Sequence, residues 1–374
     1  MRIKLLVLAW LALAGPGPAA AQVNQSIDVQ IFEAPKIVRI GATDQLVYEL
    51  HLTNFSSHPL ELNGLAIKAG DTPIKTFGRD ELPNAIDLVG PPEANSRIIP
   101  PGRRAIVYIG APVAATFPRG PISHSLTLSK IDTDEGDFTI SGGAATPETA
   151  ALPRLSPPLR GGPWVAVYDP GMERGHRRVF YAAEGTATLP GRFAIDWMKI
   201  DTSGKLSSGD ANIPANHYGF GAEVLAVADG TIVALRDDVP DPATVSGRPR
   251  PGIADASGNF VMLDIGGGRI ATYEHLKQGA PVKVGDRVKV GQVVGFLGFT
   301  GQASAPHLHF HLADRPSILG AEGQPYVFAA LTRLGQYATI DSFFRGETWP
   351  PVDRSETVRD SFPPPNLVVR FPGD

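Results

Sequence analysis

Residues 219–238 read GFGAEVLAVADGTIVALRDD, and residues 282–298 read VKVGDRVKVGQVVGFLG. In both stretches apolar residues, many of them valine, alternate with polar residues or glycine, which is typical of short strands and not of helices. Asp229 and Gly230 stand between two apolar runs, and such a pair favours a two-residue hairpin turn. The glycines of the second stretch allow positive φ and close strand approach. Together these stretches predict a compact all-β unit built from hairpins.

The region from Ile27 to about Lys130 shows similar strand signals without a helical period. In LVYELHLTN, residues 46–54, leucine and tyrosine share one face, while Glu49, His51 and Thr53 make the other face mostly polar. This spacing predicts an antiparallel, immunoglobulin-like β-sandwich over residues 23–131. It carries no cluster of chemically reactive residues, so we interpret it as a spacer or docking module.

Composition divides the rest of the chain. Residues 132–163 are rich in glycine, proline, threonine and alanine, which predicts a semi-extended linker. The second β unit is expected over residues 164–325, with a surface loop at 238–257. Residues 326–374 contain one short helical candidate and many prolines, so we expect only short elements that wrap the second unit.

The 374 residues carry a formal net charge of −4, which gives no reason to expect nucleic acid or anionic lipid as a partner. Residues 1–21 have two basic residues, a run of ten apolar residues and a small-residue end, which predicts a cleaved signal peptide. The run is too short to span a bilayer, which takes about 20 residues. Because the chain has no cysteine, we expect export to a bacterial periplasm without disulfides.

The stretch APHLHFHL, residues 305–312, places His307, His309 and His311 at alternate positions. In a strand these three side chains share one face, and the apolar residues between them share the other. Three of the nine histidines within five residues favour a metal or acid–base role over a structural one.

Two further residues are candidates for the same site. His275 ends the predicted strand in IATYEHLKQG and is interpreted as a general base or an oxyanion-stabilising imidazolium. Asp196 lies in the β-run RFAIDWMKID, residues 192–201, where a carboxylate is costly without a partner. That partner is either Arg192 on the same predicted face or a zinc ion.

Five segments, taken in order, resemble the lysostaphin and LytM-type zinc endopeptidases, which cut peptidoglycan cross-links. The segments are FAIDW (193–197), YGFGAEVLAVADGTIV (218–233), GNFVMLDIGGGRIATYEHL (258–276), VKVGDRVKVGQVVGFLGFTG (282–301) and APHLHF (305–310). The resemblance runs from about residue 192 to 312, roughly a third of the chain. It implies an all-β module, a duplicated hybrid motif, with a groove across one sheet.

In that family zinc is held by a His and an Asp spaced H-x-x-x-D and by the second His of H-x-H. The resemblance therefore implies that Asp196 and His309 are zinc ligands, and that His307 and His275 are catalytic residues beside a zinc-bound water. It also implies hydrolysis of peptidoglycan peptides, with other cell-wall proteins as further partners.

One position departs from the family pattern, because Arg192 stands where the first His ligand is expected. A guanidinium does not coordinate zinc, and we expect it to point at Asp196 and neutralise it. Three explanations remain open. His176 or His217 completes the site, with His176 favoured by similar chains that carry an upstream HRR segment; zinc is held by fewer ligands; or the module is a non-catalytic relative that binds peptidoglycan or regulates another hydrolase.

A rival interpretation uses the same kind of fold. In sugar-transport phosphocarrier domains a histidine accepts a phosphoryl group, but the predicted export signal argues against it because the phosphate donors are cytoplasmic. A purely structural role for three aligned imidazoles leaves too many polar atoms to satisfy. His311, one pleat beyond His309, is interpreted as supporting or structural.

Overall fold

The computed structural model describes residues 26–91, 96–114, 117, 120–173 and 175–373. Within these ranges the chain forms 26 strands and one short α-helix, α1 (Ile340–Phe344), so the prediction of an all-β chain is confirmed. The predicted signal peptide lies outside the described residues. None of the helices in the described part is long and apolar enough to cross a membrane.

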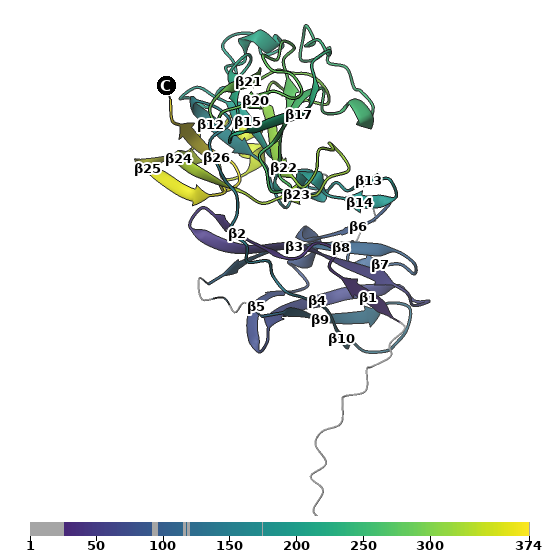
Figure 1. Cartoon of the computed structure of the whole chain (residues 1–374). Coiled ribbons are helices and arrows are strands. Elements are labelled where there is room, and N and C mark those ends of the chain that lie inside the picture. The colour runs from purple at the N-terminus through teal and green to yellow at the C-terminus, as the bar shows by residue number, and fades with distance from the viewer. Residues whose placement is uncertain (1–25, 92–95, 115–116, 118–119, 174, 374) are drawn as a thin grey trace, which may run out of the picture.

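The N-terminal part is a sandwich of two antiparallel sheets (Figure 1). One sheet contains β1 (Ile27–Gln30), β2 (Lys36–Ile40), β3 (Thr43–Asn54), β6 (Ile86–Leu88) and β8 (Arg104–Val113). The other contains β4 (Leu60–Ala69), β5 (Thr72–Phe77), β7 (Ile98–Ile99), β9 (Ile122–Lys130) and β10 (Phe138–Ala145), and η1 (Leu82–Asn84) is a short 3₁₀ turn. The apolar face of β3 packs into the shared core, as its alternation predicts.

The sandwich extends into the segment predicted as linker. β10 pairs with β9 along residues 138–145, because Phe138 and Ile140 alternate with polar residues and pack against the sandwich core. Composition alone hid this strand, since glycine and threonine surround its two apolar anchors.

The C-terminal part is built on a twelve-stranded sheet. Its main path runs β11 (Arg154–Leu155), β24 (Val327–Gln336), β26 (Leu367–Phe371), β12 (Gly161–Val167), β15 (Ile195–Lys199), β22 (Leu308–Ala313), β19 (Ile270–Leu276), β18 (Asn259–Asp264), β17 (Gly230–Arg236), β20 (Arg287–Val288), with β23 (Gly323–Gln324) and β25 (Pro351–Ser361) attached. Two small sheets pair β13 (Tyr181–Ala183) with β14 (Thr186–Thr188) and β16 (Glu223–Leu225) with β21 (Val293–Phe296). The 3₁₀ turns are η2 (His176–Arg178), η3 (Pro190–Phe193), η4 (Pro214–Asn216) and η5 (Ile253–Asp255).

The hairpin predicted at Asp229-Gly230 is wrong. β16 pairs with β21, whereas β17 pairs with β18 and β20, so the strands on either side of the pair diverge. Gly230 is required for close pairing, because a Cβ there would lie 2.3 Å from the carbonyl oxygen of Asp264. The carboxylate of Asp229 accepts hydrogen bonds from the backbone of Val290 and from Lys289, which ties it to the β20–β21 connection.

The C-terminal segment is part of the sheet instead of a wrapping of short elements. β24 and β25 are ten and eleven residues long, and β26 lies between β12 and β24. The prolines fall at or outside the strand ends, where a missing N–H costs little, and therefore do not prevent these long strands.

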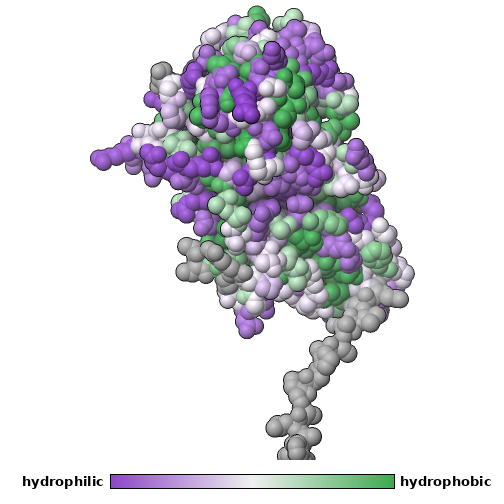
Figure 2. All heavy atoms as spheres, viewed as in Figure 1, coloured by the Kyte–Doolittle hydropathy of each residue, from purple (hydrophilic) through white to green (hydrophobic). Residues whose placement is uncertain are grey.

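The two β units lie directly against each other (Figure 1). Val38 of β2 and Val47 of β3 belong to the core of the C-terminal unit, and Ile40 pairs with Phe362 across the boundary. On the face seen in Figure 2, hydrophobic residues gather in separate clusters on both units, with hydrophilic residues between them. The boundary thus holds the sandwich against the sheet that carries the predicted site.

Candidate metal centre

The predicted site residues lie on one face of three neighbouring strands. Asp196 of β15 is directly opposite His309 of β22, and His309 is in turn opposite Glu274 of β19. Residues opposite one another in antiparallel pairs share a face. The other face of β22, with Leu308 and Phe310, packs into the core. The strand alternation therefore presents the polar row away from the core.

Three donor atoms converge at one end of this row. Asp196 accepts hydrogen bonds from His176 Nε2 and from His309 Nδ1, each at 2.9 Å. One ring nitrogen of each histidine and one oxygen of Asp196 lie within 4.8 Å of one another. His176 does not come from the sheet but from η2, which lies across Asp196. Two imidazole nitrogens and a carboxylate form a donor set that suits a tetrahedral zinc ion with one open position.

His275 and His307 lie beside this cluster. His275 has φ = 62°, and the β18–β19 pairing skips one residue there, so a bulge turns its ring toward His307, with ring centroids 4.7 Å apart. His275 Nδ1 donates to the carbonyl of Thr300 at 2.9 Å, and His307 Nδ1 donates to that of Ala305 at 2.7 Å. The bond from His275 leaves its Nε2 as the non-donating nitrogen of the neutral ring. His307 differs, because its Nε2 lies 3.4 Å from Asp196 Oδ1, and although burial opposes its charge, this carboxylate raises the pKa of His307 and favours a proton on Nε2 as well.

The charges of the cluster are set by burial and by the neighbouring rings. Burial opposes ionisation of Asp196, but His176 and His307 hold the pKa of its carboxyl well below its ordinary value. Burial, with His307 and His309 close by, lowers the pKa of His275 well below its ordinary value. At neutral pH the site therefore combines an anionic Asp196 with a neutral His275.

Glu274 and His311 complete the far end of the row. His309 Nε2 lies 3.2 Å from His311 Nδ1 and 3.8 Å from Glu274 Oε1. Burial raises the pKa of Glu274. Such groups behind a ligating imidazole orient its ring. The sequence interpretation omitted Glu274 because strand alternation placed it on the face opposite His275; only the bulge brings both into one site.

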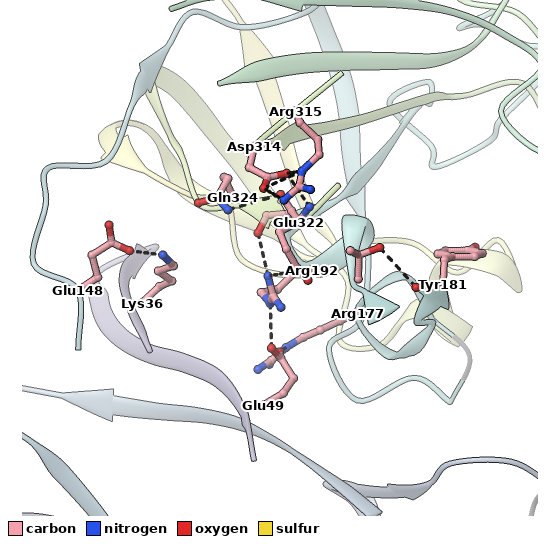
Figure 3. Close-up of polar contacts among 12 residues, drawn as sticks. Lys36, Glu49, Glu148, Arg177, Tyr181, Arg192, Asp314, Arg315, Glu322 and Gln324 are labelled. Carbon is pink, nitrogen blue, oxygen red and sulfur yellow. Dashed lines mark hydrogen bonds and ion pairs between the residues drawn. The ribbon is translucent and has the colours of Figure 1, made fainter. Parts of the chain in front are cut away.

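The expectation that Arg192 points at Asp196 is wrong. Arg192 pairs with Glu49 of the sandwich at 2.8 Å and with Glu322 at 2.8 Å (Figure 3). Arg192 belongs to the 3₁₀ turn η3, and the strand begins only at Ile195, so strand alternation does not apply to it. The turn directs the guanidinium into the boundary between the units, away from the cluster.

Of the two replacements considered for the missing ligand, the structure places His176 against Asp196. The ring of His217 donates instead to the carbonyl of Ala211 at 2.9 Å. A cleft of about 230 Å³ opens over the row and is lined by His176, Glu274, His275 and His309, among others. A ligand in this cleft would contact the cluster from the solvent side.

Residues 215–319 match the model for Peptidase family M23. The chain contains a peptidase M23 domain. The match includes His275, His307 and His309 but begins after Asp196 and His176.

Two curated relatives of this M23 domain are named as endopeptidases. The glycyl-glycine endopeptidase ALE-1 of Staphylococcus capitis is 38% identical over 133 residues, which cover 34% of this chain and 33% of the relative. The peptidoglycan DD-endopeptidase ShyC of Vibrio cholerae is 44% identical over 54 residues, 14% of this chain and 12% of the relative. The chain thus spans a third or less of the length of these two relatives.

Solved structures of peptidases also match parts of the chain. The catalytic domain of lysostaphin from Staphylococcus simulans matches with 22% identity and a TM-score of 0.25, over 44% of this chain and 88% of that one. A zinc-containing peptidase from Vibrio cholerae matches with 14% identity and a TM-score of 0.24, over 74% of this chain and 81% of that one.

Proposed function

We propose that the chain is a zinc-dependent endopeptidase that hydrolyses peptide bonds of peptidoglycan in the bacterial periplasm. The observation that carries this proposal is the convergence of His176, Asp196 and His309 beside His275 and His307. The relatives support the substrate class, since one is named a peptidoglycan DD-endopeptidase and the other a glycyl-glycine endopeptidase. The signal-like residues 1–21 support export.

His176 Nε2, Asp196 and His309 Nδ1 would hold the metal. When bound, zinc supplies a Lewis acid that lowers the pKa of a bound water toward about 7 and polarises a carbonyl. The bond from His275 Nδ1 to Thr300 leaves its Nε2 lone pair to accept a proton from the attacking water. His307 Nε2 lies 3.4 Å from Asp196 Oδ1, so a proton held between them is available to the oxyanion that forms on the substrate.

A second candidate function rests on Arg192. Its replacement of a ligand favours a non-catalytic module that binds peptidoglycan or regulates another cell-wall hydrolase. That module would need no metal and no neutral base, whereas the position of His176 at hydrogen-bond distance from Asp196 supports it as a replacement donor. We therefore favour the enzyme.

Metal analysis of the purified protein tests the proposal, together with dye release from labelled peptidoglycan. We expect one zinc per chain in the parent, loss of zinc in His309→Ala and His176→Ala, and peptidoglycan cleavage reduced at least about 100-fold in both. His217→Ala is the matched control and should keep zinc and activity. A parent that binds peptidoglycan but neither holds zinc nor cleaves it would support the non-catalytic module instead.

A further inference from the structure

We propose that the N-terminal sandwich assembles the metal site by anchoring η2, so that sandwich residues outside the M23 domain position His176. The inference rests on the proposed role of His176 as a ligand and assigns a positioning role to Glu49, Asp87, Arg177 and Arg178. The sequence indicates only a spacer or docking role for the sandwich, and the family match at residues 215–319 does not include it.

Arg177 ties the residue next to His176 to two sandwich strands. Its guanidinium donates to the backbone carbonyls of Tyr48 in β3 at 3.2 Å and Ile109 in β8 at 2.6 Å. It also contacts the Glu49 carboxylate at 3.3 Å (Figure 3). Its side chain is only 10% exposed, so these bonds are shielded from water. A buried charge-assisted fork of this kind fixes position as well as adding energy.

Arg178 makes a second anchor on the same sandwich. Its guanidinium pairs with Asp87 of β6 at 3.2 Å and lies over the ring of Tyr108, 4.9 Å from the ring centroid. The Arg178 side chain is 4% exposed. Two consecutive arginines thus fix η2 to the sandwich, and His176, which precedes them, is the one residue of the turn that reaches the cluster.

The Glu49 carboxylate also holds η3, the turn that lies beneath η2. Glu49 pairs with Arg192 of η3 as well as with Arg177 of η2. The backbone of η2 rests on η3 at Gly191, where a Cβ would lie 2.6 Å from the carbonyl oxygen of His176. The side chain of Glu49 is 3% exposed, and a buried carboxylate needs both guanidinium groups. Glu49 therefore joins the segment that lost the family ligand to the segment that supplies a replacement.

A three-residue 3₁₀ turn has little stability of its own, and η2 has no side-chain cap. The position of the His176 ring accordingly depends on what holds its two neighbours. Arg192 stands where the family ligand is expected, and in the boundary it pairs with Glu49, the carboxylate that also holds Arg177 beside His176.

The test measures zinc dissociation constants by competition with a chromogenic chelator. We expect Arg177→Met to weaken zinc binding about tenfold or more, as for other groups that orient a ligand. Asp87→Asn should weaken it about threefold, because its ion pair is partly exposed. Asp44→Asn is the matched control: it removes a sandwich ion pair with Arg39, with Asp44 27% exposed against 30% for Asp87, without touching η2. We expect it to leave zinc affinity unchanged.

Double mutants separate positioning from general stability. His176→Ala is expected to lose zinc on purification but to keep Asp196 and His309 as a weaker site, whose affinity is measured at zinc concentrations high enough to fill it. In that background Arg177→Met and Asp87→Asn should cause no further loss of zinc affinity, because they act through the missing ring. Equal losses with and without His176, or parental affinity in folded Arg177→Met and Asp87→Asn, would overturn the inference. If Arg177→Met fails to fold, Asp87→Asn alone decides. Parental zinc binding in His176→Ala would refute the ligand set itself, which is a distinct outcome.

Discussion

At the scale of residues, one face of β3 buries two ionisable groups, of which one is kept charged and the other neutral. Glu49 and His51 both project from β3 toward the second unit. Burial opposes charge on Glu49, but Arg192 and Arg177 hold its pKa below the ordinary value. His51 has aromatic neighbours instead, Phe32 and Phe180, and burial lowers its pKa to about 4. A face expected to be merely polar is therefore a specific contact surface.

His51 predicts a specific pH dependence of stability. Its folded pKa lies below the unfolded value of about 6.5, so the unfolded chain binds more protons between pH 6.5 and 4, and stability falls as pH falls through that window. From pH 7.5 to 4.5 we expect the parent to lose on the order of 2 kcal/mol more than His51→Leu, at about 1.4 kcal/mol per pKa unit. Urea unfolding of both proteins at each pH measures this. Parallel stability profiles would contradict it.

At the scale of elements, small irregularities bring the cluster together. The bulge at His275 reverses the strand alternation at the end of β19, and the η3 turn removes Arg192 from the face of β15. The bulge adds a single residue and the η3 turn has four, so both departures are short. The regular strand pairing supplies the row of Asp196, His309 and Glu274. The irregular ends of β19 and β15 bring His275 to this row and keep Arg192 away from it.

The contact between η2 and η3 gives a prediction at this scale. Gly191→Ala places a methyl group 2.6 Å from the His176 carbonyl oxygen, so the backbone of η2 must shift. We expect a loss of about 1–3 kcal/mol of stability and roughly tenfold weaker zinc binding, measured by urea unfolding and chelator competition. Gly78→Ala is the control, since nothing lies within 4 Å of the place that its methyl group would take. Parental zinc affinity in Gly191→Ala would argue against tight packing of η2 on η3.

At the scale of the whole molecule, the two units depend on each other. Val38 and Val47 complete the core of the second unit, and Glu49 neutralises Arg177 and Arg192, whose side chains are 10% and 4% exposed. Removing this carboxylate within the intact boundary, as in Glu49→Gln, would leave these buried cations uncompensated, at a cost of about 3–5 kcal/mol. The boundary is thus part of the folded core and not a loose contact.

Calorimetry tests this dependence. We expect a single thermal transition whose calorimetric and van't Hoff enthalpies agree, with or without zinc, because Val38 and Val47 belong to the core of the second unit and the ion pairs of Glu49 are buried between the units. Glu49→Gln should lower that transition as a whole. Two resolved transitions, with the sandwich unfolding separately, would contradict the shared core.

The sequence by itself determined the all-β fold and the row of candidate ligands. Alternation along β22 and β15 is a local property with a period of two residues, so it is legible without knowing what the strand packs against. This alternation predicted that His307, His309 and His311 share one face. It also placed Asp196 in a β-run, where an unpaired carboxylate is costly. It failed at Asp229-Gly230, where the partner strands were not visible in the local pattern.

Only the tertiary structure placed His176, and not His217, beside Asp196, and only it turned Arg192 toward Glu49. The contacts that decide these points join residues far apart in the chain: 20 positions separate His176 from Asp196, 113 separate Asp196 from His309, and 143 separate Glu49 from Arg192. Their outcome depends on which buried charges find partners when two units close on each other, and no local pattern encodes that choice.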